Sequence, residues 1–208
     1  AGIFDVGFDD GRAPREPLPS FDAGDPIDMR ARGFNLVRLP IDWSAIEPAR
    51  GQWADDYLDR VAGVVAWCRA AGVDVLLDLH EDGWSKELCE DGAPLWAIVP
   101  PPATLTSGPV PGPDCHTAAA ALAAFDSFWA DADQLQEAYL ELLAHVAARF
   151  RDDPAVIGYE IMNEPIGLDD AVQPFPARAA GALRDADPKK HIVFEPVATR
   201  NFPNGSPI

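Results

Sequence analysis

Apolar residues follow two patterns that alternate along this chain. Four short apolar runs predict buried strands at residues 34–39, 73–79, 156–162 and 191–195. Between them, apolar residues at helical spacing predict helices at 54–71, 117–128, 133–150 and 175–186, after a short helix at 25–32. Strands that alternate with helices predict an α/β protein whose parallel strands lie side by side in sequence order.

Residues with special backbone properties set several of the predicted ends. Pro40 is expected to end the first strand, because proline has no N–H group to give to a ladder. Gly72 is expected to stop the helix before it, since glycine readily adopts the left-handed conformation of a C-terminal cap. Thr117 and Asp133 are expected to cap the helices that follow them.

A long proline-rich segment, residues 81–116, follows the second predicted strand. Segments of this length without a strand or helix pattern are typical of lids and binding loops. Cys89 and Cys115 lie within it, and the sequence leaves open whether they form a disulfide. Cys68 lies in a helical pattern and is expected to be a small buried residue.

The composition indicates one globular domain over residues 1–208. Sixteen basic and 34 acidic residues give a net charge of −18, which argues against binding nucleic acid or an anionic membrane, because both need a cationic surface. No apolar run is long enough to span a membrane. The chain opens at Ala1 without a signal-like segment, so we expect a processed or shortened chain of a secreted or extracytoplasmic protein.

Polar residues gather at the carboxyl end of each predicted strand: Arg38, Asp78 and His80, Asn163 and Glu164, and Glu195. In an α/β barrel these ends meet at one mouth, whereas in a doubly wound sheet they flank a crevice. No glycine-rich phosphate loop follows any strand, which favours the barrel. Cys/His spacing of the zinc type and a Gly-x-Ser-x-Gly motif are also absent from the sequence, so no cofactor and no metal is predicted.

Glu164 is the candidate on which the site is centred. Pro165 follows it, ends the strand, and is expected to hold Glu164 in an extended backbone conformation. Carboxylates with an arginine, a histidine and aromatic rings are what glycoside hydrolysis requires, because one acid protonates the leaving oxygen while aromatic faces stack on sugar rings. The candidate stacking residues are Trp43, Trp84 and Trp96.

Each of these residues also has a structural interpretation that the sequence leaves open. Arg38 could pair with Asp78 without any role in binding, and His80 could be a hydrogen-bonded core histidine. The tryptophans could be packing residues. Glu195, which no asparagine precedes, is expected to be a hydrogen-bonding wall residue rather than a catalyst.

Several strings together resemble glycoside hydrolase family 5, the cellulase-type family of retaining (β/α)8 barrels. They are Val37-Arg38-Leu39-Pro40, Ile41-Asp42-Trp43, Asp78-Leu79-His80-Glu81-Asp82, Gly92-Ala93-Pro94-Leu95-Trp96-Ala97 and Asn163-Glu164-Pro165. The resemblance covers roughly residues 25–200 and is closest to the endoglycoceramidase-like branch. It implies a carbohydrate or glycolipid substrate, Glu164 as general acid/base oriented by Asn163, and Arg38, Asp78 and His80 around the reacting sugar.

The sequence departs from that family in one respect. The family's nucleophile is a glutamate on strand seven, whereas this chain is expected to contain only about strands two to five. A retaining β-glycosidase present as an incomplete chain is therefore one interpretation, and a non-catalytic half-barrel that binds carbohydrate or assembles with other proteins is another. In a third, Glu195 replaces the nucleophile. Such a partial sheet is expected to leave an unpaired edge and to self-associate.

Overall fold

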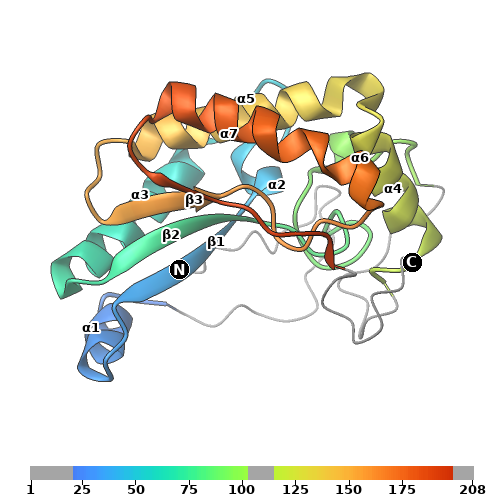
Figure 1. The fold of residues 1–208 in the computed structure, drawn as a ribbon. Coiled ribbons are helices and arrows are strands. Elements are labelled where there is room, and N and C mark those ends of the chain that lie inside the picture. The colour runs from blue at the N-terminus through green and yellow to red at the C-terminus, as the bar shows by residue number, and fades with distance from the viewer. Residues whose placement is uncertain (1–20, 103–114, 199–208) are drawn as a thin grey trace.

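The fold is built on a parallel sheet of four strands (Figure 1). A computed structural model describes residues 21–102 and 115–198. Its strands are β1 (Leu36–Asp42), β2 (Asp74–His80), β3 (Val156–Glu160) and β4 (His191–Val193). They are adjacent in the order β1-β2-β3-β4, and every neighbouring pair is parallel. The predicted class and strand order are confirmed.

Helices precede the first strand and lie in the connections between the strands. They are α1 (Gly24–Ala31), α2 (Trp43–Ile46), α3 (Asp55–Ala71), α4 (Ala119–Trp129), α5 (Leu135–Phe150), α6 (Asp169–Val172) and α7 (Pro174–Ala186), with short 3-10 turns η1 (Leu95–Ala97) and η2 (Ala132–Gln134). Helix α1 precedes β1, and among the helices in the connections α3, α5 and α7 cover one face of the sheet. Figure 1 shows α5 and α7 running side by side above the sheet. The hydrophobic core lies between these helices, α3 and the sheet.

The two faces of the sheet differ in character. On β1, Val37, Leu39 and Ile41 are buried in the core, while Arg38 between them is more exposed. Because side chains alternate along a strand and paired residues of parallel strands share a face, Asp78 lies on the same face as its β1 partner Pro40. That face therefore carries the polar residues of the candidate site.

Several strand ends differ from the sequence prediction; the fourth strand, for example, ends at Val193 instead of Glu195. Pro40 does not end β1, which continues to Asp42. Among the described residues β1 pairs only with β2, and an outer strand is where a sheet tolerates a proline. The third strand ends at Glu160 instead of Met162, although the Ile161 N–H still donates to the Val193 carbonyl at 3.0 Å.

The helix ends are a mixture of confirmed and wrong predictions. Gly72 ends α3 in the left-handed conformation, at φ 70°, as expected. Thr117 is not the cap of α4, which begins at Ala119. Asp133 has φ 51° and does not cap α5 either. Instead an earlier carboxylate, Asp131 Oδ1, accepts the Gln136 N–H at 2.9 Å in the first turn of α5.

The segment after β2 is tied down by a disulfide between Cys89 and Cys115, whose Cα atoms are 5.3 Å apart. Residues 103–114 of this segment lie outside the described part of the chain. Cys68 is buried in α3, as predicted. Within the ranges that the structure covers, no helix is both long enough and apolar enough to cross a membrane. Self-association through β1 or β4, the outer strands of the described sheet, stays a prediction.

Candidate active site

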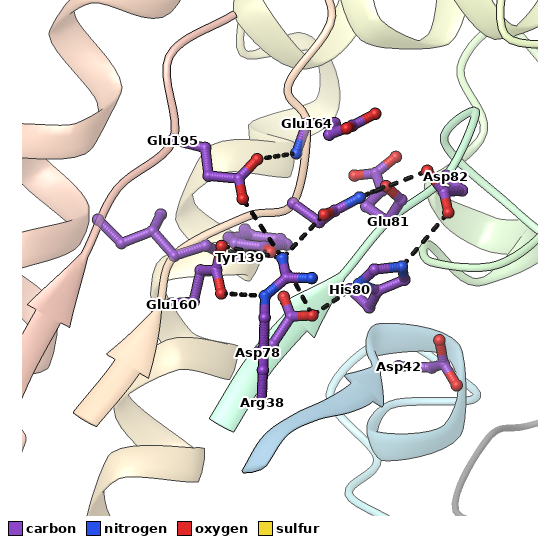
Figure 2. Close-up of polar contacts among 12 residues, drawn as sticks. Arg38, Asp42, Asp78, His80, Glu81, Asp82, Tyr139, Glu160, Glu164 and Glu195 are labelled. Atoms are coloured by element: carbon purple, nitrogen blue, oxygen red, sulfur yellow. Dashed lines mark hydrogen bonds and ion pairs between the residues drawn. The ribbon is translucent and has the colours of Figure 1, made fainter. Parts of the chain in front are cut away.

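Arg38 is the centre of the polar network on the open face of the sheet (Figure 2). Its Nε donates to Glu160 Oε2 at 2.6 Å and its Nη2 donates to Glu160 Oε1 at 2.9 Å. Asp78 Oδ2 lies 3.2 Å from the same Nη2. The hydrogen bonds to Glu160 outweigh partial burial and raise the pKa of Arg38. The sheet register brings Asp78 and Glu160 together around Arg38, because Asp78 on β2 is paired with Glu160 on β3.

Glu160 is a residue of the site that the sequence analysis missed. The sequence left open a structural pairing of Arg38 with Asp78, but the bidentate contact of Arg38 is to Glu160. Its side chain is only 2% exposed, so the ion pair is buried on the carboxylate side. A signal was present in the sequence, since Glu160 is the one charged residue within the apolar run 156–162.

Asn163 is locked in place by bonds on both ends of its amide. Arg38 Nη2 donates to Asn163 Oδ1 at 2.8 Å, and Asn163 Nδ2 donates to the Glu81 carbonyl at 2.9 Å. A longer bond of 3.3 Å runs from Nδ2 to Asp82 Oδ1. With both polar atoms of its side chain engaged, Asn163 fixes the start of the loop that carries Glu164.

His80 carries a positive charge at neutral pH. Its Nδ1 is 2.6 Å from Asp78 Oδ2, and its Nε2 is 3.3 Å from Asp82 Oδ2. Burial alone would lower the pKa of His80, but the hydrogen bonds with Asp78 and Asp82 outweigh it and raise the pKa to about 11. The imidazolium and the Arg38 guanidinium therefore flank Asp78 from two sides.

Glu164 lies at the rim, just beyond this network. Its side chain is exposed, and its backbone N–H donates to Glu195 Oε2 at 3.0 Å. The expected extended backbone is wrong, because Glu164 has φ 38°, in the left-handed region that side-chain-bearing residues rarely adopt. The bond to Glu195 compensates part of this strain. Figure 2 shows the Glu164 carboxylate pointing away from Glu195.

Glu195 is already engaged on both carboxylate oxygens. In addition to the Glu164 N–H, it lies 3.5 Å from Arg38 Nη2 through Oε1. Burial and the neighbouring Glu160 carboxylate raise the pKa of Glu195. These contacts are compatible with the expected role of Glu195, a hydrogen-bonding wall residue that holds the Glu164 backbone. That role stays a prediction.

The three candidate tryptophans form one packed cluster behind the site. Trp43 contacts Trp84 and Trp96 edge-to-face, with ring centroids 6.3 and 5.2 Å apart. Trp43 and Trp84 are 2% and 0% exposed, so neither ring has a face open to a sugar. The Trp96 ring is partly exposed, but its Nε1 is bonded to the Glu47 carbonyl at 3.0 Å. The packing alternative fits Trp43 and Trp84 in this structure.

The described residues contain one group of side chains suited to a metal ion beside this network. His80, Asp82 and Asp91 each place a ligand atom within 4.8 Å of the others. Cys89, Cys115 and His116 also lie together, but there the two sulfur atoms are joined in the disulfide.

Comparison with known proteins identifies the family. The family model of cellulases, glycosyl hydrolase family 5, matches residues 27–204, which is most of the chain. The chain belongs to glycosyl hydrolase family 5. Endoglycoceramidase I of Rhodococcus hoagii is 39% identical over 141 residues, covering 67% of this chain and 28% of that protein. An endoglycoceramidase of Cyanea nozakii is 30% identical over 171 residues, covering 72% of this chain and 34% of the other. The family and its endoglycoceramidase branch are therefore as predicted.

Solved structures of this family agree with the fold. The crystal structure of an endogalactoceramidase matches with a TM-score of 0.81 and 31% identity, over 95% of this chain and 48% of that one. Endo-glycoceramidase II from Rhodococcus sp. matches with a TM-score of 0.79 and 30% identity, over 93% and 51%. Thermotoga maritima Cel5A, at 18% identity and a TM-score of 0.58, shares the fold. The chain spans about half the length of these structures, and its strands match part of their barrel.

Proposed function

We propose that this chain carries the acid/base half of a retaining β-glycosidase that cleaves O-glycosidic bonds of a glycolipid or a β-glucan. The observation that carries the proposal is the placement of Glu164. Its carboxylate is exposed at the rim, directly after an asparagine that Arg38 and the Glu81 carbonyl lock in place. A proton donor must reach the leaving oxygen of a bound substrate while its own backbone stays fixed.

The residues around Glu164 are suited to hold the reacting sugar. Arg38 is 37% exposed on its side chain, so part of its guanidinium is open to a hydroxyl group even while Glu160 holds the rest. The charged His80 lies next to it and is 15% exposed. In this proposal Arg38, Asp78 and His80 line the sugar subsite, and Asn163 orients the acid.

The chemistry follows the two-step scheme of retaining enzymes. A carboxylate attacks the anomeric carbon while Glu164 gives its proton to the leaving oxygen, and a covalent glycosyl-enzyme forms. Glu164 then takes a proton from the water that releases the sugar. The attacking carboxylate has to lie about 5–5.5 Å from Glu164. The family resemblance implies a glutamate outside these 208 residues for that role.

Glycolipid is the favoured substrate class because relatives at 30% identity or more carry the name endoglycoceramidase. The disulfide between Cys89 and Cys115 is compatible with an extracytoplasmic protein, because such bonds persist in oxidising compartments. The glycolipid substrate is inferred from relatives and the extracytoplasmic location from general chemistry, so both are part of the proposal.

The test compares two proteins on two kinds of substrate. The 208-residue chain and the product of the whole reading frame that encodes it are each assayed on aryl β-glycosides and on glycosylceramides. The proposal expects turnover by the whole-frame protein, with glycosylceramide among its substrates. If that protein binds these glycans in calorimetry without cleaving any of them, the non-catalytic binding module is correct instead.

A further inference from the structure

A second cluster of side chains lies beside the Arg38 network, where the chain leaves β2. Asp82 and Asp91 face each other across an antiparallel bridge, and the Glu90 N–H donates to the Asp82 carbonyl at 3.3 Å. This bridge brings one oxygen of each aspartate and a ring nitrogen of His80 within 4.8 Å of one another. The three residues form a preorganised set of one nitrogen and two oxygen ligands.

Unsatisfied carboxylate oxygens point to a missing positive partner in this cluster. Glu81 is 3% exposed, and its Oε1 is buried without a hydrogen-bond partner among the described residues. Asp91 Oδ1 is in the same situation. Burying such an oxygen without a partner is unfavourable, and more so for a charged group. The charges of Asp91 and Asp82 both act on the Glu81 carboxylate, so the three carboxylates lie close together.

His80 is oriented in the way that metal-binding histidines usually are. Its Nδ1 lies 2.6 Å from Asp78 Oδ2, and a carboxylate that accepts this N–H leaves Nε2 directed at the metal. Nε2 in turn lies 3.3 Å from Asp82 Oδ2. A cation bound to Nε2 would take the place of the proton between these two atoms.

We propose that His80 Nε2, Asp82 and Asp91 bind one divalent first-row transition-metal ion such as Zn²⁺, next to the buried Oε1 of Glu81. Ligands of such an ion lie about 2.0–2.2 Å from it, so small carboxylate rotations bring atoms within 4.8 Å of one another into its shell. The imidazole selects against Ca²⁺ and Mg²⁺, which prefer oxygen-only shells. Sequence spacing gave no sign of this site, because Asp91 joins it through the bridge to Asp82.

The ion would share His80 with the proposed sugar subsite. Bound metal is therefore expected to compete with substrate, and this consequence rests on the proposed function. The binding itself does not, so it is tested without an activity assay.

Isothermal titration calorimetry with Zn²⁺ on the disulfide-intact chain tests the site. We expect about one ion per chain, affinity at least tenfold weaker in Asp91→Asn, and unchanged affinity in Asp152→Asn, whose side chain is 94% exposed. His116→Gln should also bind normally, which separates this site from the group around the disulfide. Thermal unfolding midpoints confirm that each variant is folded, and Asp82→Asn replaces Asp91→Asn if the latter is not.

Binding of Co²⁺ gives an NMR signal that distinguishes this site from a metal site on the protein surface. With Co²⁺ bound, the proton NMR spectrum should show one strongly shifted exchangeable resonance from the His80 Nδ1–H, protected by Asp78. Absence of Zn²⁺ binding, equal binding by Asp91→Asn, preference for Ca²⁺, or bound Co²⁺ without this resonance would each overturn the proposal.

Discussion

Replacing Glu160 by glutamine should destabilise the fold far more than removing a comparable surface carboxylate. Glu160 accepts two hydrogen bonds from Arg38, at 2.6 and 2.9 Å, and is 2% exposed. Glutamine has nearly the same shape but offers one oxygen and one NH₂ group. One bond to the guanidinium is therefore lost, and a buried N–H donor is left facing another donor.

The size of the effect follows from these two losses. A hydrogen bond to a charged group is worth about 1.5–3 kcal/mol, and a buried donor without a partner costs about 1–3 kcal/mol. Arg38 remains 37% exposed and keeps Asp78 at 3.2 Å, which offsets part of the loss. We expect Glu160→Gln to lower the free energy of unfolding by about 2–4 kcal/mol, near the cost of breaking a buried pair.

Urea denaturation at neutral pH measures this difference. With a slope of about 2 kcal/mol per molar, the midpoint should fall by about 1–2 M urea. Glu137→Gln is the matched control, because it removes an equivalent carboxylate from an ion pair with Arg178 whose side chains are 56% and 40% exposed. That change should cost at most about 1 kcal/mol. Equal midpoints for the two variants would show that the Arg38 network does not stabilise the site.

Three further predictions concern pH, packing and the disulfide. Since His80 has a pKa of about 11 in the fold against 6.5 for an ordinary histidine, its stabilisation is complete below about pH 6.5 and is lost as pH rises toward 11; urea curves of wild type and His80→Gln should converge across that window. Gly158→Ala places a Cβ 2.7 Å from a backbone oxygen of β4 and should lower stability by about 1–3 kcal/mol in thermal denaturation. Gly63→Ala, which meets nothing within 4 Å, should raise it by about 0.5–1 kcal/mol. Replacing Cys89 and Cys115 by serine removes a cross-link spanning 26 residues and should cost about 3–4 kcal/mol, measured by calorimetry.

The sheet could be predicted because its information is local. Each strand is a short apolar run, each connection contains a helical pattern, and parallel strands joined in this way have few possible orders. The C-terminal end of α3 at Gly72 could also be predicted, because it depends only on the backbone conformation of that glycine. Polar residues at strand ends, such as Arg38 and His80, follow from the same reasoning.

The missed features depend on partners distant in the sequence. Glu160 contacts Arg38 although 122 positions separate them, and only the registers of β1 with β2 and of β2 with β3 show that the two share a face. Whether Trp84 packs or binds sugar depends on the phenylalanines of α4 that surround it, since its ring contacts Phe125 and Phe128. The strained backbone of Glu164 could not be predicted either, because the acceptor that holds its N–H, the Glu195 carboxylate, is 31 positions away in the sequence.

The most direct test of the account is Glu164→Gln in the protein encoded by the whole reading frame. The variant cannot donate a proton, so cleavage of substrates with poor leaving groups should fall by about 10²–10⁴-fold. Activated aryl glycosides should still form the glycosyl-enzyme, because their leaving groups depart without a proton, and azide should restore turnover by attacking that intermediate. Asp152→Asn, an exposed carboxylate change, serves as the control and should behave as wild type. Equal losses on good and poor leaving groups, with no rescue by azide, would contradict Glu164 as the general acid/base.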